Sequence, residues 1–501
     1  MDREPAGLFD LHEVLAATNG DWLSAGSGAR GSEANGQPGA GGIPWVSSVT
    51  VDSRSAKKGS LFVALAGERT DGHLFVDDAI RNGSSLCLVN RTFAQEHKEK
   101  IHEILVRHGE RIITVNDTLA ALQNLSRFHM RRLHGVVTVG VTGSTGKTTT
   151  KEILGSVLLR ESSGFMNQGN LNSEIGLPLS TFDVKPGHRY AIFEMGISHQ
   201  GEMDVLADIV RPELAVITNI GLAHVGFLGS QDGIAAEKKR IFSHFDGGQT
   251  GFVWEDEPYF AFLSAEVSGR VVPYGPRTTP GYQGSEDRGL DGWVLQLGDL
   301  RVALPLVGAH NLANALCAVT VASLLGISRT HVKAGLEAVR PLAGRSRILR
   351  GPVTIIEDSY NANPEAFERA ISFLRDLPWE GRKVLVAGAM KELGAASEEA
   401  HTRLAELIRG ARFDAVYLFG TEMEAAYRVL AGAGRKITWT EDFDELRRSL
   451  ADFVVSGDIV LVKGSRAMAL ERLVEELRVV SAGGAPGRPE GLTTRQGEAG
   501  C

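Results

Sequence analysis

The sequence lacks the features that mark secreted, membrane-spanning and nucleic-acid-binding proteins. Its three cysteines, Cys87, Cys317 and Cys501, are too scattered for a disulfide framework or a zinc site. No apolar run is long enough to cross a bilayer, and the acidic start of the chain lacks the apolar core of a signal peptide. There is no basic run, and the formal net charge of −8 argues against general binding to nucleic acids or anionic membranes. We therefore expect a cytoplasmic protein with no membrane insertion and no nucleic-acid partner.

Large apolar side chains are scarce in two stretches, residues 24–42 (SAGSGARGSEANGQPGAGG) and residues 481–501. Such segments bury too little apolar surface to offset the entropy of ordering them. We interpret the first stretch as a flexible surface insertion, with a functional loop as the alternative. The second stretch predicts a disordered tail.

Elsewhere the composition is ordinary, with 43% apolar and 23% charged residues, and strand patterns alternate with amphipathic helical patterns. This alternation is typical of α/β folds, and a chain of 501 residues has room for about three domains. We predict a small N-terminal α/β domain over residues 1–134 and a central parallel-sheet domain over 135–343. A Rossmann-like third domain is expected over 344–480.

A nucleotide-binding pattern opens the central domain. The run VVTVGV (136–141) predicts a buried strand, TGSTGKTTT (142–150) follows at once, and an apolar stripe then predicts a helix. A strand, a glycine turn and a helix form a phosphate cradle, in which Lys147 can reach the terminal phosphates and the Thr148 hydroxyl suits Mg²⁺. The alternative is a glycine-rich turn with a surface lysine. The expected nucleotide contacts are Gly143, Ser144, Thr145, Gly146, Lys147, Thr148 and Thr149.

Polar side chains lie where the next predicted strands end. Glu194 closes YAIFE and His224 follows TNIGLA, so both belong to the edge of a parallel sheet where ligands bind. A carboxylate there can hold Mg²⁺, whereas a capping glutamate and a packed histidine are the structural alternatives. Lys238 lies on a helical pattern and, taken alone, reads as a solvated lysine.

Eight segments resemble the Mur ligase family and occur in that family's order. They are TGSTGKTTTKE, EMG, TNIGLAH, the lysine-bearing helix at 238, VGAHNLANALCA, GRSR, EDSYNANP and LVKGSRAM. The resemblance extends from Val51 to about Val479. Within the family, EDSYNANP (Glu357–Pro364), with the segments at 167–178 and 387–394, is similar to the member that adds a D-alanyl-D-alanine dipeptide.

The resemblance implies an ADP-forming, ATP-dependent ligase of cytoplasmic peptidoglycan precursor synthesis. It implies an acyl-phosphate intermediate, two small-molecule substrates, UDP-MurNAc-tripeptide and D-Ala-D-Ala, and a monomeric enzyme. The alternatives are a sister Mur ligase, a folylpolyglutamate synthetase, or a non-catalytic nucleotide-binding paralogue. The sequence leaves open whether the third residue of the tripeptide is diaminopimelate or lysine.

The resemblance also implies residue roles. Thr148 and Glu194 would hold one Mg²⁺; His224 and a carbamoylated Lys238 would support a second, with Lys239 as a rival for the carbamate. Lys147, Lys238, His224 and Arg345 would be the catalytic group, and Asn311, Asn314, Arg345 and Asp358 would contact the nucleotide. Substrate contacts would come from Ser53, Arg54, Asp71, His73, Asn170, Asn172, Ser173, Tyr360, Asn361, Asn363, Lys463 and Ser465. The chain departs from the family pattern at Ala389, where an acidic residue is usual, and at Ser173, where an asparagine is usual.

Overall fold

The structure, a computed structural model, describes residues 7–24, 45–67, 70–160, 162–432 and 434–481. Nearly all of the predicted insertion and tail therefore lies outside the described residues. The chain divides into two compact units. The first unit comprises Met1–Gly143, Thr150–Thr218 and Ala235–Pro273, and the second comprises Ser144–Thr149, Asn219–Ile234 and Tyr274–Cys501.

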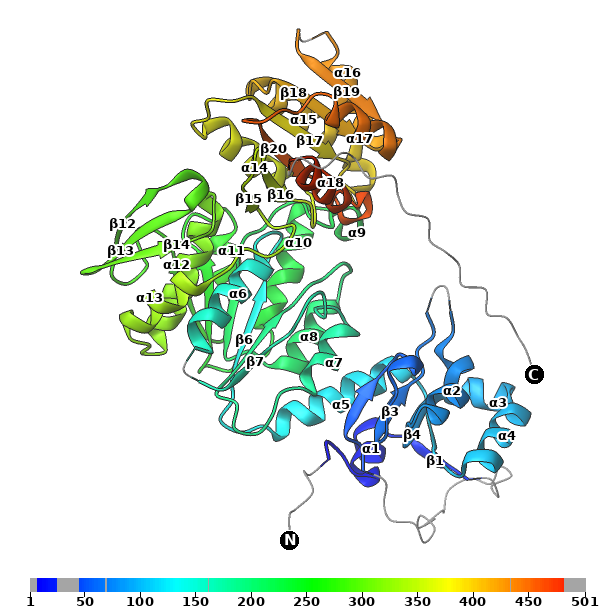
Figure 1. The fold of residues 1–501 in the computed structure, drawn as a ribbon. Helices are drawn as coiled ribbons and strands as arrows, with labels where there is room; N and C mark the ends of the chain where they lie inside the picture. Colours follow the sequence, from blue (N-terminus) through cyan, green and yellow to red (C-terminus); the bar gives the residue numbers. More distant parts are fainter. Residues whose placement is uncertain (1–6, 25–44, 68–69, 161, 433, 482–501) are drawn as a thin grey trace. The chain divides into compact units, whose positions relative to one another are not determined.

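The first unit begins with a five-stranded sheet of order β1-β5-β4-β3-β2 (Figure 1). Only β1 runs antiparallel to its neighbour. Successive residues of β3 and β4 enter two different apolar clusters, as expected where helices cover both faces of a sheet. The strands are β1 (Asp21–Leu23), β2 (Ser48–Thr50), β3 (Ser60–Val63), β4 (Leu86–Asn90) and β5 (Ile112–Val115). The helices are α1 (Leu11–Thr18), α2 (Val76–Arg81), α3 (Arg91–Glu96), α4 (Lys98–His108) and α5 (Thr118–Arg132).

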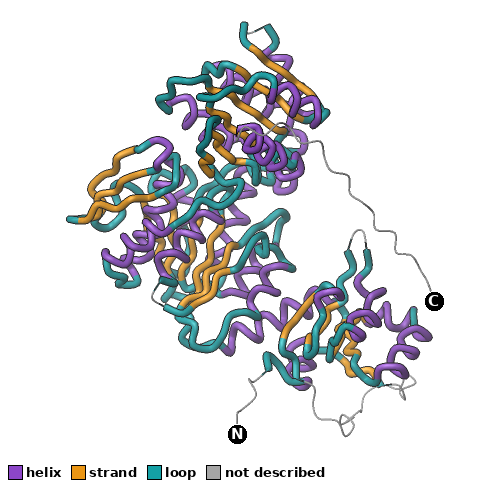
Figure 2. Tube along the Cα trace, viewed as in Figure 1, coloured by secondary structure: helices purple, strands orange, loops and turns teal. Residues whose placement is uncertain are grey.

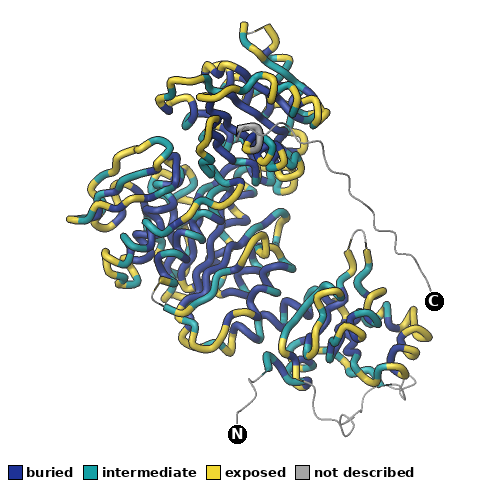
Figure 3. Tube along the Cα trace, in the orientation of Figure 1, coloured by how far each residue is buried: buried dark blue, intermediate teal, exposed yellow. Residues whose placement is uncertain are grey.

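A six-stranded sheet of order β11-β10-β9-β6-β8-β7 carries the predicted phosphate loop. The strands β10, β9, β6, β8 and β7 pair in parallel, and all of them except the half-buried edge strand β7 are mostly buried (Figure 3). The strands are β6 (Val137–Thr142), β7 (Gly164–Met166), β8 (Tyr190–Glu194), β9 (Leu214–Ile217), β10 (Thr250–Trp254) and β11 (Arg270–Tyr274). The helices along this part of the chain are α6 (Lys147–Leu158), α7 (Gly176–Thr181), α8 (Glu202–Val210), α9 (Val225–Leu228), α10 (Gln231–Lys239) and α11 (Phe260–Ser264). The buried parallel strand and the following helix predicted around the loop are thereby confirmed.

The second unit contains an antiparallel meander that the sequence analysis did not predict. Its strands are β12 (Tyr282–Asp287), β13 (Trp293–Leu297) and β14 (Leu300–Leu304). Two helices follow, α12 (Ala309–Leu324) and α13 (Arg329–Ala338). Burial is nearly continuous in the middle of α12, which explains why its sequence has little amphipathic pattern.

The C-terminal part of the second unit is a six-stranded sheet of order β15-β16-β20-β17-β18-β19. Helices alternate with its strands along the chain (Figure 2). Only the edge strand β15 is antiparallel, so the Rossmann-like alternation is confirmed. The strands are β15 (Arg347–Leu349), β16 (Thr354–Asp358), β17 (Lys383–Gly388), β18 (Ala415–Phe419), β19 (Lys436–Thr440) and β20 (Ile459–Lys463). The helices are α14 (Pro364–Asp376), α15 (Ser397–Gly410), α16 (Glu424–Leu430), α17 (Phe443–Ala451) and α18 (Glu471–Ser481).

Within the described ranges, every helix is too short or too polar to span a bilayer.

Candidate nucleotide-binding and ligase site

The loop between β6 and α6 depends on its two glycines. Gly143 has φ +147°, and a Cβ there would lie 1.8 Å from Thr218 Oγ1. Gly146 has φ +83°, and a Cβ there would lie 3.0 Å from Asn314 Oδ1. Since α6 begins at Lys147, the backbone turns sharply and then presents the start of a helix. This is the local geometry that a phosphate-binding loop requires.

Asn219, which the sequence analysis did not single out, fixes the middle of this loop. Its side chain accepts a hydrogen bond from Thr145 N (2.9 Å) and donates one to Thr145 Oγ1 (2.6 Å). Its carbonyl accepts from Ser144 N at 3.0 Å. The TNIGLAH segment that contains Asn219 was the signal available in the sequence.

Glu194 is held from several sides at the end of β8. It pairs in register with Val141 of β6 and is only 3% exposed. Its Oε1 accepts a hydrogen bond from Asn172 Nδ2 at 2.7 Å. The side chain of Asn167 accepts from Glu194 N (2.8 Å) and donates to Glu194 O (3.1 Å). Asn172 was predicted to contact substrate; the contact recorded here is with the predicted metal ligand.

A buried lysine supports the same network. Lys151 is 1% exposed, and its Nζ donates to Asn167 O at 2.6 Å and lies 3.3 Å from a carboxylate oxygen of Glu152. A buried ammonium requires such partners. Lys151 belongs to the TGSTGKTTTKE motif, but its contact with the loop after β7 was not predicted.

The two candidate lysines for carbamoylation differ in burial. Lys238 is 1% exposed, whereas the ammonium of Lys239 lies 4.7 Å from the centroid of the Phe262 ring. The neighbouring Glu237 accepts from Gly201 N and Met203 N, both at 2.9 Å. The end of α10 therefore turns Glu237 and Lys238 into the protein.

His224 adopts left-handed backbone angles, and its Nδ1 lies 2.9 Å from Glu392 Oε2. The nearby imidazole of His224 outweighs burial and lowers the pKa of Glu392. Glu392 belongs to the 387–394 segment that the sequence analysis singled out, but its pairing with His224 was not predicted. The imidazole is thus oriented by a carboxylate far away in the sequence.

Predicted residues of the third domain gather around one ion pair. Lys463 Nζ lies 2.6 Å from Asp358 Oδ2 and also donates to Asn361 O at 3.1 Å. Ser346 N donates to Asp358 Oδ1 at 3.1 Å. The guanidinium of Arg345 lies 3.9 Å from the centroid of the Tyr360 ring.

The remaining predicted residues of this group make backbone contacts. Asn363 caps α14 by accepting from Ala366 N at 2.9 Å. Ser465 Oγ accepts from Lys391 N at 2.9 Å. Both contacts fix the loops that carry the predicted ligands.

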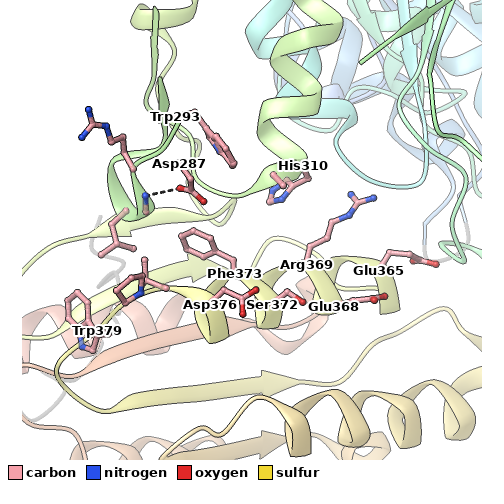
Figure 4. A pocket seen from close by; sticks show the side chains of 16 residues that line it. Asp287, Trp293, His310, Glu365, Glu368, Arg369, Ser372, Phe373, Asp376 and Trp379 are labelled. Atoms are coloured by element: carbon pink, nitrogen blue, oxygen red, sulfur yellow. Dashed lines mark hydrogen bonds between the residues drawn. The ribbon is translucent and has the colours of Figure 1, made fainter. Parts of the chain in front are cut away.

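A cleft of about 990 Å³ lies beside the start of α12 and along α14 (Figure 4). Its lining includes Trp293, His310, Arg369 and Phe373. Burial and then the charge of Arg369 lower the pKa of His310 to about 4, so its imidazole is neutral at neutral pH. None of these four residues was predicted to belong to a site.

Two of the predicted nucleotide contacts, Asn311 and Asn314, lie one turn apart on α12. Asn314 Nδ2 donates to Asn311 Oδ1 at 3.1 Å, and Asn311 Nδ2 donates to Val307 O at 2.8 Å. His310 of the cleft directly precedes Asn311. The structure thus brings the predicted pair together on the helix that begins at the cleft.

The N-terminal domain has a cavity of about 440 Å³ whose lining includes Asp71, His73, Asn90 and Phe93. His73 Nδ1 lies 2.6 Å from Asp71 Oδ1, and its Nε2 accepts from Asn90 N at 3.0 Å. Burial raises the pKa of Asp71, but the backbone N–H and ring of His73 outweigh it, and the pKa falls below its usual value. The imidazole also stacks on the Phe93 ring, 4.7 Å between centroids.

Four other predicted substrate contacts lie at exposed or partly exposed positions. Arg54 pairs with Asp52, and its side chain is 87% exposed; Ser53 is its neighbour in a 3₁₀ turn. Asn170 and Ser173 are exposed in the loop before α7. Their roles stay predictions.

The donor set suits Mg²⁺ at Glu194, because a buried carboxylate is the hard oxygen ligand that this ion prefers. Across the described part of the chain, no three His, Cys, Asp or Glu side chains cluster so as to hold a metal ion. A Mg²⁺ at Glu194 therefore needs hydroxyl, phosphate or water oxygens as further ligands.

A glycine loop between a parallel strand and a helix, with a buried carboxylate in register on the adjacent strand, defines a nucleotide-dependent phosphoryl-transfer enzyme. Comparison with known families agrees with this class. Residues 46–130 match the Mur ligase family catalytic domain, 141–322 the Mur ligase middle domain, and 344–466 the Mur ligase glutamate ligase domain.

Relatives are similar over almost the whole chain. A UDP-N-acetylmuramoyl-tripeptide–D-alanyl-D-alanine ligase of Treponema pallidum is 39% identical over 474 residues, which is 94% of this chain and 99% of that protein. A crystal structure of MurF from Acinetobacter baumannii is 29% identical, with a TM-score of 0.80, covering 95% of this chain and 99% of its own. MurF ligase from Thermotoga maritima in complex with ADP is 31% identical, with a TM-score of 0.73, covering 85% and 96%. The chain belongs to the Mur ligase family.

Three successive family domains agree with the predicted three-domain α/β architecture. The predicted boundaries at residues 134, 343 and 480 stay predictions, since the compact units divide the chain differently.

Proposed function

We propose that this protein uses ATP to join D-alanyl-D-alanine to UDP-MurNAc-tripeptide, forming ADP and phosphate, in cytoplasmic peptidoglycan precursor synthesis. The observation that carries the proposal is the 39% identity, over 94% of the chain, to a ligase of that name. EDSYNANP adds support, because Asp358 and Asn361 of that motif both contact Lys463.

The chemistry brings two anions together, so the site must neutralise charge and align the reactants. The tripeptide carboxylate attacks the γ-phosphorus of ATP, and ADP leaves. The dipeptide amine then attacks the resulting acyl phosphate, and phosphate leaves as the amide bond forms. Lys147 and the backbone N–H groups at the start of α6 would hold the phosphates throughout.

Mg²⁺ would supply further positive charge against the triphosphate, with Glu194 and Thr148 as its ligands. The nucleotide would also contact Ser144, Thr145, Thr149, Asn311, Asn314, Arg345 and Asp358. The neutral imidazole of His310 can lie against a purine ring without carrying charge into the cleft.

The two substrates, UDP-MurNAc-tripeptide and D-Ala-D-Ala, would bind at separate sites. The cavity with Asp71 and His73 suits part of the UDP substrate, since its lining combines the Phe93 ring with amide and carboxylate groups. Lys463, Ser465, Tyr360, Asn361 and Asn363 would line the dipeptide side. The enzyme would act as a monomer.

The proposal extends to a carbamate on Lys238 that, with His224, supports a second Mg²⁺. The burial of Lys238 favours it over Lys239. Lys238→Ala should fold normally but lose nearly all activity, and acetate or formate should partly restore it by placing an anion in the vacated space. Full activity of Lys238→Ala would move the role to Lys239, for which Lys239→Ala is the matched control.

The function is tested by phosphate release from the purified protein. Release should require ATP, UDP-MurNAc-tripeptide and D-Ala-D-Ala together, and the product should gain the mass of the dipeptide. Release with glutamate and a folate in place of both substrates would instead indicate a folylpolyglutamate synthetase. Nucleotide binding without release would indicate a non-catalytic paralogue.

A further inference from the structure

Arg369, on the second turn of α14, contacts the phosphate loop. Its Nη1 donates to Thr145 Oγ1 at 2.6 Å, across 224 residues of sequence. Thr145 lies between the two loop glycines, so this cation lies beside the segment that is expected to hold phosphates. Arg345, the arginine for which a phosphate role was predicted, lies over the Tyr360 ring instead.

A second contact from the same face of α14 holds this helix against the neighbouring loop. Glu365, four residues before Arg369, accepts from Leu222 N at 2.8 Å through Oε1. A Cβ on Gly221 would lie 2.8 Å from Glu365 Cδ, so the helix and the loop after β9 approach closely. Residues four apart share one helix face, and α14 therefore presents Glu365 and Arg369 together to the loop segments at 145 and 221–222.

The surroundings of Arg369 suit an anion. Figure 4 shows Arg369 extending from α14 toward His310 at the start of α12. The positive charge of Arg369 contributes to lowering the pKa of that imidazole. The N–H groups of Ser144 and Thr145 both donate to Asn219, so these two loop amides are engaged within the protein. A guanidinium has five N–H donors in a planar fork, which can hold a hydroxyl and phosphate oxygens at once.

We propose that Arg369 is a phosphate-positioning residue that α14 supplies to the phosphate loop, where it holds Thr145 and neutralises the polyphosphate of the bound nucleotide. The inference rests on the proposed function, because it takes ATP as the ligand of the loop. It adds a residue to which no role was assigned from the sequence.

The test compares two nucleotides that differ in phosphate number. The non-hydrolysable ATP analogue AMPPNP, with Mg²⁺, and AMP are titrated into the full-length protein by calorimetry. Arg369→Ala should weaken AMPPNP binding about tenfold or more, as expected for a lost charged hydrogen bond, and change AMP binding by less than about twofold. Arg369→Lys should recover part of the lost AMPPNP affinity, because lysine restores the positive charge but not the planar set of N–H donors.

Arg375→Ala is the matched control, since Arg375 lies on the same helix but pairs with Asp376 in a largely exposed position. It should bind both nucleotides like the wild type. If Arg369→Ala does not fold, Arg369→Gln removes the charge while keeping most of the side chain. AMPPNP binding within twofold of wild type in the folded variant would overturn the inference. Equal weakening of AMP and AMPPNP binding would also overturn the inference, because it would mean that Arg369 only stabilises the loop and does not contact the phosphates.

The inference and the proposed function fail in distinguishable ways. Wild-type protein that does not bind AMPPNP would overturn both. Wild-type protein that ligates the two substrates, together with an Arg369→Ala variant of unchanged AMPPNP affinity, would overturn the inference alone.

Discussion

Two of the proposed Mg²⁺ ligands are held in opposite ways. Glu194 ends a central strand, is almost completely buried, and receives hydrogen bonds from Asn172 and Asn167 in the loop after the neighbouring strand β7. His224 lies in a loop with left-handed backbone angles, is partly exposed, and pairs with Glu392, 168 residues further along the chain by their numbers. One ligand is fixed by its own sheet; the other depends on a distant segment.

This difference indicates where the site is rigid. Asn167, Asn172 and Lys151 form a connected set of polar contacts around Glu194, so its carboxylate has little freedom before any ligand binds. The pair between His224 and Glu392 involves a carboxylate that is 54% exposed, and water competes for it. We therefore expect substitutions on the Glu194 side to affect catalysis more than those on the His224 side.

The largest effect is expected from Glu194→Gln. The amide keeps the size of the side chain and can still accept from Asn172, but it removes the negative charge that would hold Mg²⁺. We expect turnover to fall roughly 10³-fold, in the range found when a preorganised charged group is lost. The measurement is steady-state phosphate release at saturating substrates. Near-wild-type turnover would mean that Glu194 has a structural role and does not hold Mg²⁺.

An intermediate effect is expected from Asn172→Ala. Glu194 would keep its charge but lose the donor on Oε1, and loss of a residue that orients a metal ligand typically costs about 10–100-fold in metal affinity or activity. The Mg²⁺ concentration giving half-maximal rate should therefore rise by about that factor.

The control for this variant is Gln168→Ala, at an exposed position in the same loop. If Asn172 instead contacts substrate, as its place in the sequence motif suggested, the Michaelis constant for the UDP substrate should rise while the Mg²⁺ dependence stays unchanged.

The same contrast explains what could be predicted from the sequence. The strands predicted at VVTVGV (136–141) and at YAIFE agree with the observed β6 (Val137–Thr142) and β8 (Tyr190–Glu194), because continuous apolar runs between helices indicate buried parallel strands. The loop glycines and Glu194 were found for the same local reason. The meander over 282–304 was missed because its first strand, YQGSED, is mostly exposed and carries no strong apolar pattern.

Contacts between distant segments were also missed. The pairs Arg369–Thr145 and His224–Glu392 depend on how α14 and the segment around Glu392 pack in the fold. No periodicity or spacing in one sequence reports such packing. Asn219 and Asn167 were different, since both lie within motifs that the sequence did mark, but their side-chain partners depend on which strands are neighbours.

The smallest effect is expected from Glu392→Gln. The neutral amide keeps the size of the side chain beside His224 Nδ1, and a pair this exposed is worth only about 0–1 kcal/mol. Turnover should therefore change by less than about threefold, and the Mg²⁺ concentration giving half-maximal rate should rise by no more than about that factor. Glu424→Gln, which removes an exposed pair with Arg428 on α16, is the matched control. A loss of tenfold or more in Glu392→Gln alone would mean that the carboxylate itself belongs to the site, and the His224 side would then be as tightly organised as the Glu194 side.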